Sequence, residues 1–410
     1  MASFFILKSF CYFHSMRQII SLAFVLCTSW LNAQKDSSFY WLGKSTGKLP
    51  VLAFGLGDDR LGGTKMGYID SNIIFKVIDS VQNIYQVQLS KYHTAFIDKS
   101  FIKKDSLLHE KPFYLTNSIL AKGTDTCYDI VSINLDEKLP YRSWMETEPS
   151  KIILEIFGVQ ANTNWITHLS TLKEVKNIYY NQVEDDVVRI TIDLKHKQQW
   201  GYSLGYSNKI LVLKVKRQPE NLDITKLKIA IDAGHGGTNS GAEGVRSKAS
   251  EKEYTLIFAK ALASYLKKNG VKNVIMTRTT DTSFDIKDRV LFLQQKNPDL
   301  LISIHLNSSN NAEVNGSSTY YKYIGFRPLT ESLLKRMPEL KPNEFGNVGN
   351  FNFTLNSPTD FINALLEVAF LSNETDERKI TDTKFPPKLA IQVYKGIVDW
   401  LNEIQRQRIQ

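Results

Sequence analysis

The segment LKIAIDAGHGG at residues 227–237 decides the fold of the last third of this 410-residue chain. Its apolar run ends in a glycine-rich turn that carries His235, and a second apolar run, DLLISIHLN at 299–307, ends in the same way at His305. Runs of this kind alternate with helical patterns from residue 227 to residue 404, which predicts a twisted, mostly parallel sheet flanked by helices. Ligands bind at the carboxyl ends of such strands, so we expect the two imidazoles to converge on one ion. This arrangement predicts a metal hydrolase.

A catalytic zinc ion normally has three protein ligands and one open position for water, so two histidines are one ligand short. Cys127 lies in a different predicted domain, and a carboxylate is therefore the expected third ligand. A helical pattern begins after Ser250, where Ser250 and Glu253 have the spacing of a capping box. That spacing leaves Glu251 at the first helical position as the candidate ligand. A carboxylate there also suits the helix dipole, so a purely structural interpretation stays open.

A further ionisable residue, Glu367, stands in the apolar run ALLEVAFLSN at 364–373. A carboxylate is costly to bury in such surroundings unless it has a partner. A metal-bound water would be such a partner, and burial would raise the pKa of Glu367 toward the range of a general base. The alternative is a strand with one glutamate facing solvent.

Residues 227–404 resemble the zinc-dependent N-acetylmuramoyl-L-alanine amidases of the amidase-3 type. Those enzymes cut the amide between the lactyl group of muramic acid and the first alanine of the peptidoglycan stem. The resemblance rests on many motifs in the same order and not on one short motif. The motifs are IDAGHGG at 231–237, GA at 241–242, EKE at 251–253, TRTTD at 277–281, DR at 288–289, SIHLN at 303–307, YY at 320–321 and LEVAFLSN at 366–373.

The resemblance implies a role for each matching residue. His235, Glu251 and His305 would be the Zn²⁺ ligands, and Glu367 would be the catalytic carboxylate that takes a proton from the zinc-bound water. These are the same four residues that the reasoning from the strand ends selects.

Four more residues near these motifs are candidates for supporting roles. Asp232 and Asn307 flank the ligands and are interpreted as orienting them, although both residue types also form turns. Arg278 and Arg289 are interpreted either as binding the carboxylates of the peptide stem or as forming salt bridges within the fold.

The part of the chain before the catalytic domain reads as β structure. Residues 48–104 resemble a bacterial SH3-like barrel, and residues 111–217 are similar to the AMIN modules that often precede such amidases. Strands are expected near 128–135, 150–157, 187–194 and 210–216. Both units have two interpretations, envelope targeting or a structural spacer. The polar, proline-containing segment 218–226 is predicted to be a linker.

Residues 1–33 have the pattern of an export signal, with Met16 as a possible true start and Ala33 at the expected cleavage site. Export to the periplasm or cell envelope follows, with no transmembrane helix in the mature chain. The net charge of +9 is spread along the chain, and no nucleic-acid motif is present. The predicted partners are peptidoglycan and an envelope-associated regulator, not nucleic acid.

The sequence therefore predicts a multidomain hydrolase that cleaves the bond between N-acetylmuramic acid and L-alanine. Two alternatives remain at this stage. One is a zinc peptidase acting within the stem peptide, and the other is a non-catalytic wall-binding or activator protein. The joint presence of His235, Glu251, His305 and Glu367 argues against the second.

Overall fold

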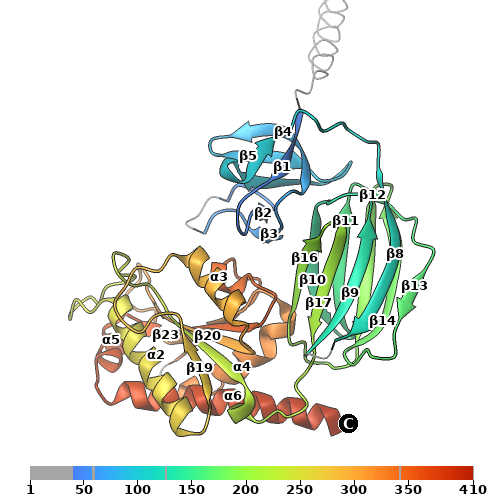
Figure 1. Ribbon diagram of the computed structural model, residues 1–410. Helices are drawn as coiled ribbons and strands as arrows, with labels where there is room; N and C mark the ends of the chain where they lie inside the picture. Colours follow the sequence, from blue (N-terminus) through green and yellow to red (C-terminus); the bar gives the residue numbers. More distant parts are fainter. Residues whose placement is uncertain (1–39, 58–60, 125–126, 341–342, 410) are drawn as a thin grey trace, which may run out of the picture.

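A computed structural model describes residues 40–57, 61–124, 127–340 and 343–409, which form three packed domains (Figure 1). The predicted export signal at 1–33 lies outside the described residues. The two β-rich domains come first in the chain, and the α/β domain follows them.

The first β domain is one seven-stranded sheet with the order β3-β2-β6-β5-β4-β1-β7. It already begins at β1, before the expected boundary at Lys48, because β1 pairs with both β4 and β7. The SH3-like identity of this domain stays a prediction. Its strands are β1 Trp41–Ser45, β2 Val51–Ala53, β3 Lys65–Tyr68, β4 Ile74–Val81, β5 Ile84–Gln88, β6 Thr94–Asp98 and β7 Ile102–Lys104.

The second β domain contains two sheets, one with the order β10-β11-β15-β14 and one with β12-β8-β9-β17-β16, to which β13 is added beside β8. All four expected strands are present, because their alternating apolar residues fill the core of this domain. Its strands are β8 Tyr114–Gly123, β9 Tyr128–Leu135, β10 Tyr141–Thr147, β11 Ser150–Phe157, β12 Val159–Gln160, β13 Ile166–His168, β14 Val175–Glu184, β15 Val187–Leu194, β16 Tyr202–Ser207 and β17 Ile210–Lys216.

The third domain is built on a six-stranded sheet with the order β19-β18-β20-β23-β21-β22. Its strands are parallel except where β21 meets β23. The predicted fold class, an α/β domain after two β-rich domains, is confirmed. The strands are β18 Lys228–Ala233, β19 Asn273–Met276, β20 Leu300–Asn307, β21 Ser317–Tyr320, β22 Glu344–Val348 and β23 Ile362–Phe370.

Helices cover both faces of this sheet. The apolar residues of α2, α4 and α6 pack against one face in the main core, whereas Val290 and Leu293 of α3 pack against Ala230 and Leu301 on the other. The face beneath α3 therefore carries every second residue of each central strand, including those at the strand ends. The helices are α2 Glu251–Lys268, α3 Ile286–Lys296, α4 Arg327–Leu334, α5 Glu374–Ile380 and α6 Phe385–Ile409.

The second β domain and the third domain share an apolar junction. The ring centroids of Trp200 and Trp400 are 5.3 Å apart, and each side chain is 1% exposed. The Trp400 indole N–H donates to the side-chain oxygen of Gln198 at 3.1 Å, so its polar atom is also satisfied. The predicted linker is ordered as well, because Arg408 of α6 donates to the carbonyl of Glu220 at 2.9 Å.

Trp400→Ala should lower the free energy of unfolding by about 3 to 5 kcal/mol, because it leaves a large cavity at this junction. Urea unfolding followed by circular dichroism measures the loss. The matched control is Trp165→Ala, which removes a side chain that is 68% exposed and should change stability by less than about 0.5 kcal/mol. Equal effects of the two substitutions would contradict a shared core.

Candidate metal centre

The turn after β18 places His235 at the carboxyl edge of the sheet. His235 adopts a left-handed backbone conformation with φ of 58°. Non-glycine residues rarely adopt this conformation, and when they do it is often at functional sites. Gly234 is required beside it, because a Cβ atom there would lie 2.4 Å from the ring of His305. The turn thus brings the two imidazoles together, with ring centroids 5.1 Å apart.

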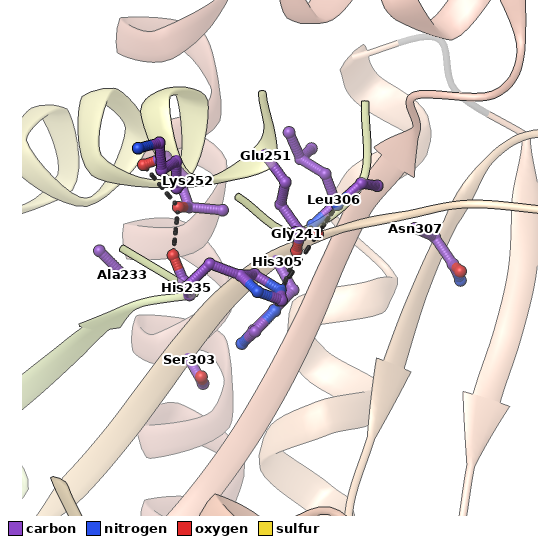
Figure 2. A network of polar contacts seen from close by, with 12 residues as sticks. Ala233, His235, Gly241, Glu251, Lys252, Ser303, His305, Leu306 and Asn307 are labelled. Atoms are coloured by element: carbon purple, nitrogen blue, oxygen red, sulfur yellow. Dashed lines mark hydrogen bonds and ion pairs between the residues drawn. The ribbon is translucent and has the colours of Figure 1, made fainter. Parts of the chain in front are cut away.

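The carboxylate of Glu251 joins the two histidines (Figure 2). Glu251 is the first residue of α2, as expected, and its Oε1 lies 3.0 Å from Nδ1 of His305. Its Oε2 lies 3.1 Å from Nε2 of His235. The same carboxylate accepts backbone hydrogen bonds from Ala242 at 2.8 Å and Leu306 at 2.9 Å. It is therefore fixed from several directions.

The predicted capping box at the start of α2 is wrong. Ser250 is the N-cap residue, but its side chain makes no capping hydrogen bond. Backbone carbonyls already accept the first helical N–H groups: Ala242 accepts from Glu251, Ser240 from Lys252, and Ser250 itself from Glu253. These backbone N–H groups are therefore already hydrogen-bonded, and the Ser250 side chain is not needed to accept from them.

The electrostatics of the cluster suit a cation. One ligand atom each from His235, Glu251 and His305 lie within 4.8 Å of one another. Burial acts to raise the pKa of Glu251, but the hydrogen bonds and charges of the two histidines outweigh it and hold that pKa well below its usual range. Burial acts to lower the pKa of His235, and Glu251 outweighs it and raises that pKa. Two imidazoles and a carboxylate are a typical ligand set for zinc.

Two polar residues lie beside the histidines. Asp232, fully buried, has Oδ2 4.0 Å from Nε2 of His305, beyond hydrogen-bond range, and accepts hydrogen bonds from Thr277 and Ser303, both at 2.7 Å. Burial acts to raise the pKa of Asp232, but Arg289 and His305 outweigh it and lower that pKa. The second residue, Asn239, was not predicted: its side-chain oxygen lies 2.9 Å from Nδ1 of His235, which leaves Nε2 facing Glu251. Its position four residues after His235 does not by itself indicate this contact, because the contact requires the loop to turn back onto the ring.

The structure does not bring Asn307 to the ligands. Its amide nitrogen donates to the Tyr320 hydroxyl at 3.4 Å, and its oxygen accepts from the backbone of Ser308 at 2.8 Å. Figure 2 shows this side chain pointing away from the cluster. Asn307 lines the cleft that contains the cluster, without a hydrogen bond to any of the three ligand candidates.

Both predicted arginines bind the turn that carries His235. Arg278 is 3% exposed and donates to the carbonyls of Ala233 at 3.0 Å and Gly234 at 2.8 Å. Arg289, also 3% exposed, donates to the carbonyls of Ala233 and His235 and to Asp232. Their guanidinium groups are thus engaged within the fold, which favours the structural interpretation over contacts to stem carboxylates.

Glu367 lies beside the cluster on the neighbouring strand. It is paired with His305 in the parallel register of β20 and β23, so both side chains emerge on the face beneath α3. Both line a cleft of about 960 Å³ that also contains His235 and Glu251. The charge of Glu367 contributes, after burial, to the raised pKa of Tyr320 on the next strand. The structure therefore brings all four principal candidates to one cleft.

These features define an α/β protein with a buried metal-binding cluster at the strand ends. Residues 229–399 match the family described as N-acetylmuramoyl-L-alanine amidase, and residues 121–215 match the AMIN domain. The germination-specific N-acetylmuramoyl-L-alanine amidase of Bacillus subtilis is 30% identical over 205 residues, which cover 45% of this chain and 84% of that protein. The chain therefore belongs to the N-acetylmuramoyl-L-alanine amidase family.

A second relative and one solved structure also match the same part of the chain. The probable cell wall amidase LytH of Staphylococcus saprophyticus is 30% identical over 194 residues, covering 47% of this chain and 64% of that protein. Among solved structures, the catalytic domain of CwlV from Bacillus (Paenibacillus) polymyxa is 33% identical, with a TM-score of 0.41 and coverage of 42% of this chain and 97% of that one.

Asn239→Ala should lower the affinity for a divalent ion by about 10- to 100-fold, because it frees the ring of a ligand histidine. Titration with zinc against a chelating dye measures the change. Ser240→Ala, in the same loop, is the matched control and should bind as the unchanged protein does. Equal affinity of all three proteins would show that Asn239 does not orient His235.

Proposed function

We propose that this protein is a zinc-dependent amidase that hydrolyses the bond between N-acetylmuramic acid and L-alanine in peptidoglycan. The observation that carries the proposal is the register of β20 and β23. It sets Glu367 directly beside His305, within the same cleft as His235 and Glu251. Family membership supplies the reaction class.

Zinc fits the residues present. One nitrogen each of His235 and His305 and one carboxylate oxygen of Glu251 lie within 4.8 Å of one another, and two imidazoles with a carboxylate are a typical donor set for this ion. His235, Glu251 and His305 are the ligands we assign. When bound there, zinc would polarise the scissile carbonyl and activate water near neutral pH.

The remaining chemistry falls to the side chains of the cleft. The carboxylate of Glu367 accepts the proton of the attacking water and returns it to the alanine nitrogen as the amide bond breaks. Asn239 keeps the imidazole of His235 oriented throughout, and the carboxylate of Asp232 lies beside His305. Arg278 and Arg289 hold the carbonyls of the turn, so that His235 does not move away from Glu251.

The site of action we propose is the periplasm or cell envelope, with export through the signal at residues 1–33. The amidase family acts on the cell wall, and a net charge of +9 favours approach to an anionic envelope. The described residues run from 40 to 409 with three short gaps. Among them, no helix is long and apolar enough to cross a membrane. The two β domains are suited to targeting or to contact with an envelope-associated regulator.

Glu367→Gln should retain bound zinc and lower kcat by about 100-fold or more. The reason is that the glutamine side chain cannot accept the proton of the attacking water, as the carboxylate of Glu367 does. Mass spectrometry of muropeptides measures release of intact stem peptides, and elemental analysis measures the metal. His305→Ala is the comparison and should lose both metal and activity. Products cut within the stem would instead identify a peptidase, and unchanged turnover by Glu367→Gln would exclude its catalytic role.

A further inference from the structure

The first β domain reaches the catalytic cleft. Leu61, in the connection between β2 and β3, lines the same cleft as His305 and Glu367. Figure 1 shows this domain beside α3, and Lys287 of α3 lies 4.3 Å from the ring of Phe101 in the first domain. Leu61 precedes both His305 and Glu367 by more than 200 residues in the sequence, yet it forms part of the candidate active site.

One side chain, Asn352, holds this connection in place. Its oxygen accepts from the backbone N–H of Lys65 at 3.0 Å. Its amide nitrogen faces three successive carbonyls, those of Leu61 at 3.4 Å, Gly62 at 3.1 Å and Gly63 at 3.1 Å. A single asparagine therefore bonds to backbone groups along the whole segment 61–65.

Further contacts join the same parts of the chain. The ammonium group of Lys65 donates to the Asn352 carbonyl at 3.0 Å, and the Tyr68 hydroxyl donates to the carbonyl of Thr354 at 3.3 Å. Residues 352–354 therefore contact the first β domain, as does Lys322, which donates to the carbonyl of Lys65 at 2.7 Å. Phe351 and Phe353, the neighbours of Asn352, face the cleft.

An aromatic row runs along this wall from the candidate metal ligand. The ring of Phe353 is 5.3 Å from that of His305, and Phe351 stacks on Phe353 at 6.4 Å. Leu61 adds to the apolar surface on this side. The remaining lining mixes polar side chains, such as Thr238, Asn239 and Asp285, with apolar ones such as Phe284 and Ile286. The cleft thus has a continuous apolar surface beside His305 and hydrogen-bonding groups elsewhere in its lining.

We propose that Leu61, Phe351 and Phe353 form a saccharide-binding wall and that Asn352 is the positioning residue that completes it. A sugar ring presents apolar C–H faces, which pack on aromatic and aliphatic side chains, whereas the peptide stem needs hydrogen-bonding groups, which the rest of the cleft supplies. The inference rests on the proposed function for its substrate. It makes the first β domain a part of substrate recognition at the scissile bond.

Binding to inactive full-length protein tests the wall. In the Glu367→Gln background, Leu61→Ala should weaken binding of a purified disaccharide-tetrapeptide roughly three- to tenfold and leave binding of the free tetrapeptide unchanged. Isothermal titration calorimetry gives both constants. Leu56→Ala is the matched control, because Leu56 belongs to the same domain, is 38% exposed and does not line the cleft. Equal binding by the Leu61 and Leu56 variants, or no disaccharide-tetrapeptide binding, overturns the inference.

Two substitutions of Asn352 test the positioning role. Asn352→Ala loses the side-chain contacts, and Asn352→Asp keeps an acceptor for Lys65 but has no donor for the three carbonyls. Both should speed amide hydrogen exchange in residues 61–65 and raise KM for the disaccharide-tetrapeptide, with kcat retained. Asn343→Ala should change neither, because Asn343 is an exposed asparagine before β22 whose amide nitrogen donates to Asn315 and not to the first β domain. Unchanged exchange in both Asn352 variants overturns the positioning role.

These measurements separate the two proposals. Exchange and calorimetry do not depend on turnover, so they support or overturn the wall even if the unchanged protein releases no stem peptide. Absence of stem-peptide release would instead count against the proposed function alone.

Discussion

The candidate site depends on the buried carboxylate of Glu251. A carboxylate in this position would be expensive without donors, and Glu251 receives them from two imidazoles and two backbone amides. These four contacts join the start of α2, the turn after β18 and the end of β20. The separate elements are therefore fixed relative to one another at the point where the ligand atoms meet. The two arginines extend the same constraint, because they hold the carbonyls of the turn that carries His235.

Much of the fold could be predicted because its signals are local. Apolar runs predicted β18, β20 and β23, and the helical pattern after Ser250 predicted α2. Strands β21 and β22 were missed, since the buried sequence SSTY of β21 is polar and becomes a strand only by pairing with β23. The capping box failed for a related reason. Its donors are satisfied by carbonyls of a loop that only the folded chain places at the helix start.

His235, Glu251 and His305 could be selected from sequence because each stands where an apolar strand or an amphipathic helix begins or ends. Glu367 could be selected because it is the one ionisable residue inside the apolar run at 364–373. Asn239 could not be selected, since its role depends on the turn of the loop back onto His235. The same holds for Leu61, which reaches the cleft only when two domains pack together. Asn307 shows the opposite error: it is adjacent to a ligand in sequence, yet its hydrogen bonds go to Tyr320 and Ser308.

The two β domains are attached to the catalytic domain by partly different contacts. The second β domain shares buried tryptophans with α6, and a large apolar contact of this kind contributes several kcal/mol. The first β domain combines polar and apolar contacts. Asn352 supplies hydrogen bonds worth about 1 kcal/mol net each, and Leu49 and Tyr68 pack against the apolar cluster that contains Leu293 of α3. The position of Leu61 beside the candidate metal ligands therefore depends on both kinds of contact.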